Sequence, residues 1–194
     1  MAETPKKTWK QIAKKILCNL WDMVKIIIIT VALVIIVTQV FIMNAIIPTG
    51  SMIPQIQPGS VVFCSRVDYW KESPKRGDIV TFRRGNIDDK TYYTKRIVGE
   101  PGDTVEIKQG ITYINGKKYD EPWLAEEPEK LDFGPFEVPE GEYFLMGDNR
   151  NHSYDCRYWE ETYIPEKTIY ARARIVFETD PFKIEVLHYP QTEK

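Results

Sequence analysis

The stretch IIIITVALVIIVTQVFIMNAII, residues 26–47, runs for 22 residues without a charged side chain. As an α-helix it would be about 33 Å long, which is enough to cross the hydrocarbon core of a bilayer. A helix buried in a soluble core rarely stays uncharged for so long. A cleaved secretory peptide would need a shorter apolar stretch followed by an Ala-x-Ala-like site, whereas residues 44–48 read NAIIP. We therefore predict one retained transmembrane helix over residues 26–47, which separates residues 1–25 from residues 48–194.

Lysines dominate the segment before this predicted helix. Residues 1–25 carry six lysines against Glu3 and Asp22, a net charge of +4, and since the whole chain carries −2, the remainder carries −6. The positive excess predicts a single-pass protein of the cell membrane, with its N-terminus in the cytoplasm and residues 48–194 on the far side. Apolar residues at near-helical spacing in Lys6–Trp21 fit either an amphipathic helix on membrane lipid or a helical lead-in to the span.

The composition excludes several classes of protein. A mean hydropathy of −0.36 is too polar for a multi-span transporter, and 43% hydrophobic residues are too many for a disordered chain. An acidic main domain also argues against nucleic-acid binding, which needs a basic face. Three cysteines, Cys18, Cys64 and Cys156, are too few and too scattered for a disulfide scaffold or a metal knuckle. A single disulfide between Cys64 and Cys156 remains open.

Beyond Pro48 the sequence is typical of β-structure. Short segments rich in Val, Ile, Tyr and Phe alternate with turn signals, of which Asn115-Gly116 is the clearest hairpin. The predicted strands are residues 60–67, 78–82, 91–98, 104–107, 111–114, 142–146 and 171–177. The Pro- and Glu-rich run from Glu121 to Glu140 predicts an irregular segment outside the core, which would belong to a smaller cap subdomain. We expect an all-β domain with no long amphipathic helix after the anchor.

A serine follows a glycine shortly after the apolar stretch, in PTGSMIP, residues 48–54. If this segment is extended, Thr49 and Ser51 project to the same side, and Gly50 leaves room for another backbone. Ser51 could then attack a carbonyl while the Thr49 hydroxyl and the Ser51 backbone N–H stabilise the oxyanion. Taken alone, the segment fits a polar loop leaving the bilayer better than a catalytic site.

A nucleophilic serine needs a base, for which the sequence offers histidine or lysine. His188 has no polar cluster around it, but His152 lies in a polar run, so composition leaves a Ser-His-Asp triad open. Alternation along the predicted strand 91–98 places Lys95 between Tyr93 and Ile97 on one face. Such neighbours disfavour an ammonium and lower the pKa of a lysine, as a lysine base requires. Most lysines on strands instead keep a solvated head group.

Four segments in order resemble the sequence boxes of the bacterial type I signal peptidases. They are PTGSMIP, RGDIVTF (76–82), YTKRIVGEPGD (93–103) and GDNRNHSYDCRYW (147–159). Behind one anchor they are most similar to the small Gram-positive members. The resemblance implies a signal-peptidase/LexA-like all-β catalytic domain with an inserted β cap at about 101–143. It also implies a membrane-bound serine endopeptidase with a Ser-Lys dyad and no metal or cofactor, which cleaves signal peptides from secreted preproteins after small residues at −3 and −1.

Position by position, the resemblance assigns a role to individual residues. Ser51 becomes the nucleophile and Lys95 the general base, Thr49 completes the oxyanion hole with Ser51, and Ser153 orients the lysine. Two further groups follow: Ile47, Met52, Ile56 and Tyr93 line the pockets for the small side chains, while Asp148, Asn149, Arg150 and the ion pair Asp155–Arg157 support the site.

Some positions depart from the family pattern. His152 replaces a non-catalytic polar residue, which favours the dyad over the triad, while Thr81 and Thr94 stand where apolar pocket residues often occur. One rival interpretation is a self-cleaving repressor protease of the LexA type, against which the anchor and the acidic domain argue. Another is a non-enzymatic membrane-tethered β-domain that acts as a scaffold or binding module. Neither the preproteins cut nor the oligomeric state follows from the sequence.

Overall fold

The structure, a computed structural model, describes residues 9–84 and 91–187 of the 194-residue chain. The chain forms two compact units that are divided between Phe41 and Ile42. We call the second, which begins at Ile42, the β unit. His188, considered above as a base, lies outside the described residues, as do Lys6 and Lys7.

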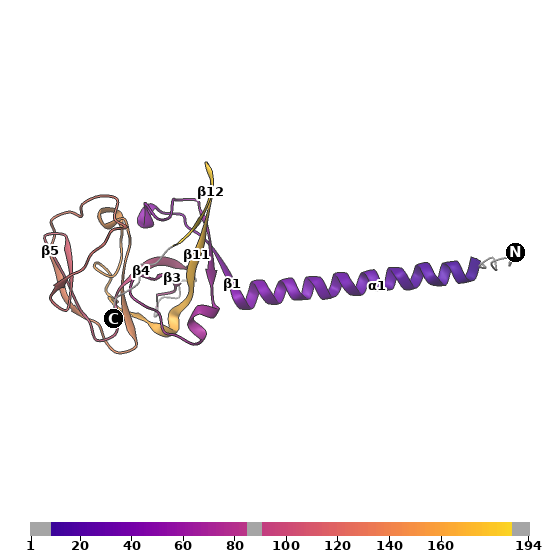
Figure 1. Cartoon of the computed structure of the whole chain (residues 1–194). Coiled ribbons are helices and arrows are strands. Elements are labelled where there is room, and N and C mark those ends of the chain that lie inside the picture. The colour runs from indigo at the N-terminus through magenta and orange to yellow at the C-terminus, as the bar shows by residue number, and fades with distance from the viewer. Residues whose placement is uncertain (1–8, 85–90, 188–194) are drawn as a thin grey trace. The chain divides into compact units, whose positions relative to one another are not determined.

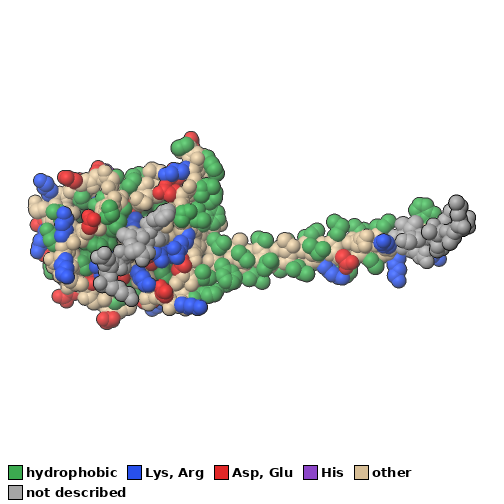
Figure 2. All heavy atoms as spheres, in the orientation of Figure 1, with side chains coloured by type: hydrophobic (Ala, Val, Ile, Leu, Met, Phe, Trp, Pro, Cys, Tyr) green, Lys and Arg blue, Asp and Glu red, His purple; other side chains and the backbone are tan. Residues whose placement is uncertain are grey.

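The first unit is a single long helix. Helix α1 (Trp9–Ile36) continues into a π turn, η1 (Val37–Phe41), and Lys14–Phe41 is long and apolar enough to cross a membrane, with a mean hydropathy of 2.6. Hydrophobic side chains cover its surface (Figure 2). The Thr38 hydroxyl donates to the Val34 carbonyl oxygen at 2.8 Å, which satisfies a polar group inside an apolar stretch. Because α1 is continuous from Trp9, the described part of the basic segment, residues 9–25, is helical up to the span.

The helix ends before the uncharged stretch does, which corrects the prediction that residues 26–47 are helical throughout. Strand β1 (Ile42–Ile46) pairs antiparallel with β2 (Val61–Ser65). Along β1, Met43 and Ala45 are buried while Ile46 is exposed, the alternation of a half-buried strand. An uncharged run of apolar residues fits a lipid-facing helix and such a strand alike, so the sequence did not reveal this boundary.

An eight-stranded antiparallel sheet forms the centre of the β unit (Figure 1). Its strand order is β1-β2-β11-β3-β4-β9-β10, and β12 pairs with β11. The remaining bounds are β3 (Ile79–Phe82), β4 (Tyr93–Gly99), β9 (Glu142–Met146), β10 (Ile164–Pro165), β11 (Ile169–Thr179) and β12 (Phe182–Val186). The other helical elements of the described part are short 3₁₀ turns, so the all-β prediction for this unit is confirmed.

A second sheet, of order β7-β6-β5-β8, is formed between β4 and β9 in the sequence. Its strands, β5 (Thr104–Lys108), β6 (Ile111–Ile114), β7 (Lys117–Lys118) and β8 (Phe133–Glu137), fall within the range 101–143 expected for the cap. Asn115 and Gly116 have φ values of 52° and 75°, as a tight Asn-Gly hairpin requires.

Strand β8 corrects the prediction that residues 121–140 are irregular throughout. Phe136 stacks on Phe144 of the main sheet, with ring centroids 4.7 Å apart, and so joins the second sheet to the main core. Positions 134 and 135 hold a glycine and a proline, which are uncommon inside strands. Residues 133–137 therefore lack the pattern of β-branched residues that would have indicated a strand.

The core of the β unit consists of two hydrophobic clusters. One surrounds Phe82 and Phe144, and the other surrounds Met52, Ile56 and Val62. Cys64 and Cys156 are buried in different clusters as free thiols, so the disulfide left open above is not formed. Burial raises the pKa of the Cys64 thiol to about 11 and that of Cys156 further.

A buried ion pair joins β4 to the loop after β9. Arg96 Nε and Nη2 donate to the two Asp148 carboxylate oxygens at 2.7 and 2.6 Å, and both side chains are almost fully buried. Arg96 Nη1 also donates to the Gly77 carbonyl oxygen at 2.8 Å, and the guanidinium lies 4.4 Å from the Trp123 ring centroid. The position of this loop therefore depends on a charge pair that has no access to water.

We expect Asp148→Ala to lower the free energy of unfolding of the β unit by about 3–5 kcal/mol, because the Arg96 charge would stay buried without its partner. Urea unfolding of the full chain in detergent, followed by tryptophan fluorescence, measures this change. The control is Glu72→Ala, which removes the exposed Lys75–Glu72 pair and should cost less than about 1 kcal/mol. Equal costs for the two variants would contradict the role given to the buried pair.

Candidate active site

A groove of about 830 Å³ in the β unit contains both Ser51 and Lys95. Its walls are residues 44–49, from β1 and the segment after it, and residues 91–95, from β4 and the segment before it. Arg84, His152, Tyr154 and Trp159 complete the lining. Segments about 45 residues apart in the sequence therefore meet around the two predicted catalytic side chains.

Ser51 lies in the 3₁₀ turn η2 (Gly50–Met52), directly after the extended residue Thr49. The segment is therefore not extended as far as Ser51, but the Thr49 and Ser51 hydroxyl oxygens still lie 3.4 Å apart. The loop after β9 holds this turn in place: the Asn149 backbone N–H donates to the Ser51 carbonyl oxygen, and Asn149 Nδ2 donates to that of Gly50, both at 3.0 Å. Asn149 thus fixes the position of Ser51 by binding the backbone carbonyl groups of the serine turn.

Lys95 is on β4 opposite Val80 of β3, and it is only 4% exposed. Its ammonium Nζ donates to Ser153 Oγ at 3.0 Å. Burial lowers the pKa of Lys95 to about 8; the Asp155 and Asp148 charges oppose this change, and the Arg157 charge assists it. At pH 7 about one lysine in ten would then be neutral, compared with roughly one in 2,500 at an unperturbed pKa.

Gly147 allows the loop after β9 to approach the serine turn. A Cβ atom at this position would overlap Ser153 Oγ and the Ser51 carbonyl oxygen. Its backbone N–H donates to Asp155 Oδ2 at 2.9 Å. From the sequence, Gly147 was only the first residue of the segment 147–159 that resembles a family box, because close packing between distant segments leaves no local signal.

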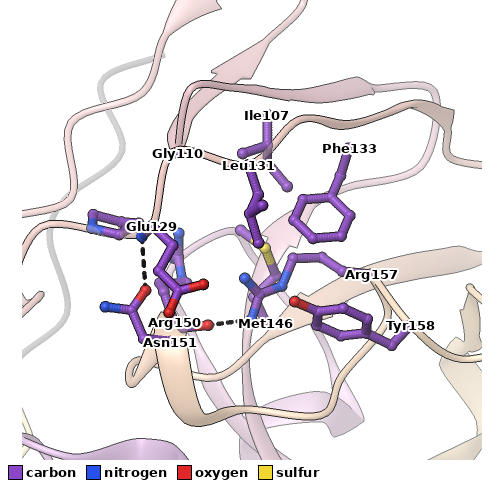
Figure 3. A pocket seen from close by; sticks show the side chains of 11 residues that line it. Ile107, Gly110, Glu129, Leu131, Phe133, Met146, Arg150, Asn151, Arg157 and Tyr158 are labelled. Carbon is purple, nitrogen blue, oxygen red and sulfur yellow. Dashed lines mark hydrogen bonds between the residues drawn. The ribbon is translucent and has the colours of Figure 1, made fainter.

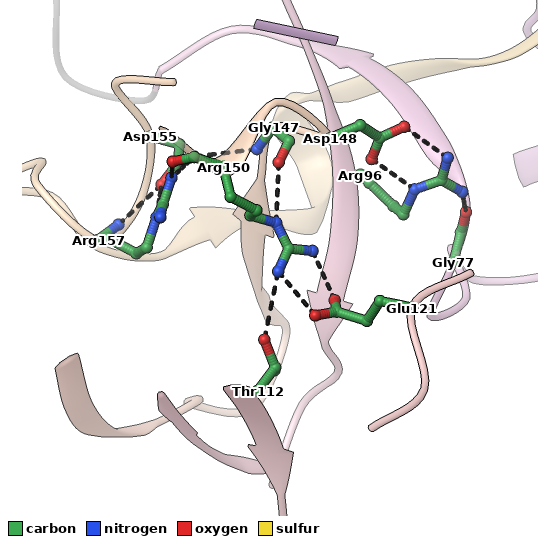
Figure 4. A network of polar contacts seen from close by, with 9 residues as sticks. All are labelled: Gly77, Arg96, Thr112, Glu121, Gly147, Asp148, Arg150, Asp155 and Arg157. Carbon is green, nitrogen blue, oxygen red and sulfur yellow. Dashed lines mark hydrogen bonds and ion pairs between the residues drawn. The ribbon is translucent and has the colours of Figure 1, made fainter. Parts of the chain in front are cut away.

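Asp155 and Arg157 form the predicted ion pair next to Ser153 (Figure 4). Arg157 Nε and Nη2 donate to the Asp155 carboxylate at 2.8 and 2.9 Å, and Nη2 also donates to the Arg150 carbonyl oxygen. Burial alone would raise the pKa of Asp155, but the hydrogen bonds and charge of Arg157 hold it below its usual value. The carboxylate therefore stays ionised beside Lys95.

Two partners of the predicted support residues were missed by sequence reasoning. Arg96 pairs with Asp148, and Glu121 pairs with Arg150 at 2.8 and 2.5 Å (Figure 4). In the sequence, Arg96 is only the residue after Lys95 on the predicted strand 91–98, and Glu121 is one of many acidic residues in the predicted cap. Neither pairing could be read from sequence spacing, since 52 and 29 residues separate the partners.

The predicted pocket residues divide into two pairs. Ile47 and Tyr93 line the groove. Met52 and Ile56 are fully buried in the same core cluster as Ile47, and so they lie beneath its wall. Thr94 also lines the groove; its hydroxyl lies 3.4 Å from that of Thr81, which in turn contacts Cys64 Sγ.

His152 lies at the groove but is exposed, in the 3₁₀ turn η4 (Arg150–His152). Among the described residues, no hydrogen bond joins it to Asp155, whose oxygens accept from Arg157 and Gly147. A Ser-His-Asp triad needs a carboxylate on the histidine. The geometry therefore favours lysine as the base.

A second cavity lies behind the support network, next to Arg150, Arg157, Leu131 and Phe133 (Figure 3). Its volume of about 20 Å³ has room for little more than one water molecule. Within residues 9–84 and 91–187, no group of three or more His, Cys, Asp or Glu side chains could hold a metal ion. The groove around Ser51 and Lys95, at about 830 Å³, has room for a peptide.

Comparison with known proteins gives a consistent result. The family model described as "Signal peptidase, peptidase S26" matches residues 20–178. Signal peptidase I of Bacillus amyloliquefaciens is 39% identical over 166 residues, which cover 81% of this chain and 85% of the relative. Signal peptidase I T of Bacillus subtilis (strain 168) is 37% identical, with the same two coverages.

Two further matches come from other bacteria. The probable signal peptidase I-2 of Synechocystis is 34% identical over 180 residues, which cover 89% of this chain and 75% of the relative. A crystal structure of a signal peptidase I from Enterococcus faecalis V583 is 30% identical, with a TM-score of 0.45, and covers 52% of this chain and 97% of the other. On the family match and these identities, the chain belongs to the peptidase S26 family of signal peptidases.

Proposed function

We propose that this protein is a membrane serine endopeptidase that removes signal peptides from secreted preproteins, with Ser51 as nucleophile and Lys95 as general base. Membership of the peptidase S26 family makes it a hydrolase of this class. The observation that carries the proposed dyad is the burial of the Lys95 amine in the groove that also contains Ser51. A scaffold would gain nothing from a buried lysine, whose change in pKa from 10.5 to about 8 costs about 3 kcal/mol.

In this mechanism neutral Lys95 takes the proton of Ser51, whose oxygen attacks the carbonyl carbon of the cleaved peptide bond. Lys95 then returns that proton to the leaving amine, and water hydrolyses the acyl-enzyme. Ser153 Oγ, 3.0 Å from Nζ, orients the amine during both transfers. All proton transfers in this mechanism take place between side chains of the protein, the substrate and water.

The oxyanion that forms on the carbonyl needs hydrogen-bond donors already in place. The Thr49 hydroxyl, 3.4 Å from Ser51 Oγ, and the Ser51 backbone N–H are the two proposed donors. Asn149 supports this arrangement because it binds the carbonyl oxygens on both sides of the Ser51 amide. One such donor is typically worth about 3 kcal/mol in the transition state.

The substrate would bind as an added strand. In the described registers β4 pairs with β9 only from Arg96 onward, so the β9-facing edge of β4 at Thr94 and Lys95 lies in the groove. An extended peptide paired with this edge would place alternate side chains toward the groove wall. Ile47, Tyr93 and Thr94 line that wall, and we propose that they select small side chains, as cleavage after an Ala-x-Ala sequence requires.

Orientation and lipid contact are parts of the same proposal. The lysines before the span support an orientation with the N-terminus in the cytoplasm and the β unit outside. Strand β12 exposes Phe182, Ile184 and Val186, and β1 exposes Ile46. Contact with membrane lipid would remove these side chains from water.

Substituting the two catalytic residues should abolish cleavage of a preprotein with an Ala-x-Ala site. We expect Ser51→Ala and Lys95→Ala each to lower kcat/KM by at least about 10³-fold, and the double variant to be no worse than either, because the two side chains act as a unit. His152→Ala is the matched control and should retain activity within about fivefold. Loss of cleavage in His152→Ala alone would instead support a triad.

The pH dependence of cleavage should follow the protonation of Lys95. Because its pKa is lowered to about 8, the neutral form is the minority below pH 8 and the majority above it. We therefore expect kcat/KM for a short peptide substrate to rise about tenfold per pH unit up to about pH 8 and then to level off. An acidic limb of the profile that reports a pKa near 6.5 would indicate a histidine base and contradict the dyad.

Protease protection tests the orientation. In intact cells stripped of their wall, added protease should remove a C-terminal tag and leave an N-terminal tag until the membrane is permeabilised. The reverse pattern would place the β unit in the cytoplasm, where exported preproteins do not present their cleavage sites.

A further inference from the structure

Arg84 carries a positive charge in the groove that the proposed chemistry does not use. It lies two residues after β3 and lines the groove together with Ser51 and Lys95. Its guanidinium carbon is 4.6 Å from the centroid of the Trp159 ring, a stacked arrangement, and Trp159 itself is only 4% exposed. Arg84 Nε is buried without a hydrogen-bond partner.

The described surroundings of Arg84 contain no carboxylate partner. Within residues 9–84 and 91–187 no aspartate or glutamate lines the groove and no ion pair involves Arg84. By contrast, Arg96, Arg150 and Arg157 each have a carboxylate partner. A guanidinium stacked on an aromatic ring keeps the N–H groups along its edge for a planar, bidentate acceptor.

The strand register gives the position of Arg84 along the groove. Phe82 of β3 pairs with Tyr93 of β4, and Val80 pairs with Lys95. Continuing this register by two residues places Arg84 opposite Thr91, four residues from Lys95. At about 3.3 Å per residue the separation is about 13 Å. Arg84 and the edge proposed for the peptide lie on opposite sides of β4 but border the same groove, so Arg84 would meet a side chain of an extended peptide at about its fourth or fifth residue from the cleaved bond.

We propose that Arg84 is a specificity-determining residue that binds an acidic side chain of the preprotein, four or five residues from the cleaved bond. The inference rests on the proposed function, which it deepens by naming a class of substrate. A carboxylate at this position exchanges water for a charged partner in a groove whose described lining holds no acid. Of the arginine and lysine side chains described along the groove, Arg84 is the one that can hold a carboxylate, since Lys95 must be neutral to act.

A peptide scan with the detergent-solubilised full chain tests this role. Fluorogenic peptides with one Ala-x-Ala site carry Glu or Gln at each position from six residues before the cleaved bond to six residues after it. For the wild type we expect kcat/KM to be about tenfold higher for Glu than for Gln at one position four or five residues from the bond. This Glu/Gln ratio should fall to about one in Arg84→Gln. In Arg84→Glu a lysine peptide should become the better substrate.

Arg83→Gln is the matched control. Arg83 also stacks on aromatic rings, 4.4 Å from Tyr92 and 5.7 Å from Tyr170, and its Nε is likewise buried and unpartnered, but it does not line the groove. The Glu/Gln ratio of this variant should equal that of the wild type. Because the ratio compares two peptides on one enzyme, a general loss of activity or stability in a variant does not change it.

The possible results separate this inference from the proposed function. If the Gln peptides are cleaved by the wild type but not by Ser51→Ala, and no position gives a ratio above about two, the role of Arg84 is wrong and the proposed function stands. A ratio that survives Arg84→Gln, or that falls equally in Arg83→Gln, also overturns the role of Arg84. If no peptide is cleaved at all, both proposals fail together.

Discussion

The burial of one lysine side chain is the constraint on which the rest of the site depends. Lys95 is held 4% exposed on a central strand, and removing its head group from water brings its pKa to about 8. The nearby carboxylates of Asp155 and Asp148 would undo this change if they were unpaired. Arg157 and Arg96 bind them, so that the amine lies beside charge pairs rather than beside free anions. The support network therefore has an electrostatic role as well as a mechanical one.

Three arginine–carboxylate pairs hold the loop after β9 against the serine turn. Arg96–Asp148 joins it to β4, Arg150–Glu121 joins it to the segment that follows the second sheet's hairpin, and Asp155–Arg157 closes the loop on itself. Buried pairs of this kind contribute little net stability, but breaking one is costly. They select one arrangement of the loop, in which Asn149 reaches the serine turn and Ser153 reaches the lysine. The second sheet thereby helps to position the active site, although it contributes no reactive group to that site.

The groove itself combines backbone edges with few charges. Residues 44–49 and 91–95 form two extended walls, to which a peptide could bind by its main chain regardless of most of its side chains. Recognition by main-chain pairing suits an enzyme that processes many preproteins. On the inference drawn above, side-chain selection falls to polar groups of the groove such as Thr94, near the lysine, and Arg84, at a distance from it.

The sequence by itself determined the anchor, the β character of the rest of the chain, and the identities of Ser51 and Lys95 as reactive candidates. These features depend on local properties: an uncharged run, alternation over short segments, turn residues, and a motif order that resembles one family. The end of the helix at Phe41 and the strand at 133–137 were missed because apolarity does not distinguish helix from strand, and because glycine and proline conceal a strand. Only the tertiary structure decided that Lys95 is buried, that Asp148 pairs with Arg96, that Arg150 pairs with Glu121, and that Gly147 must lack a side chain. Burial and pairing depend on which distant segments pack together, and no local pattern of residues contains that information.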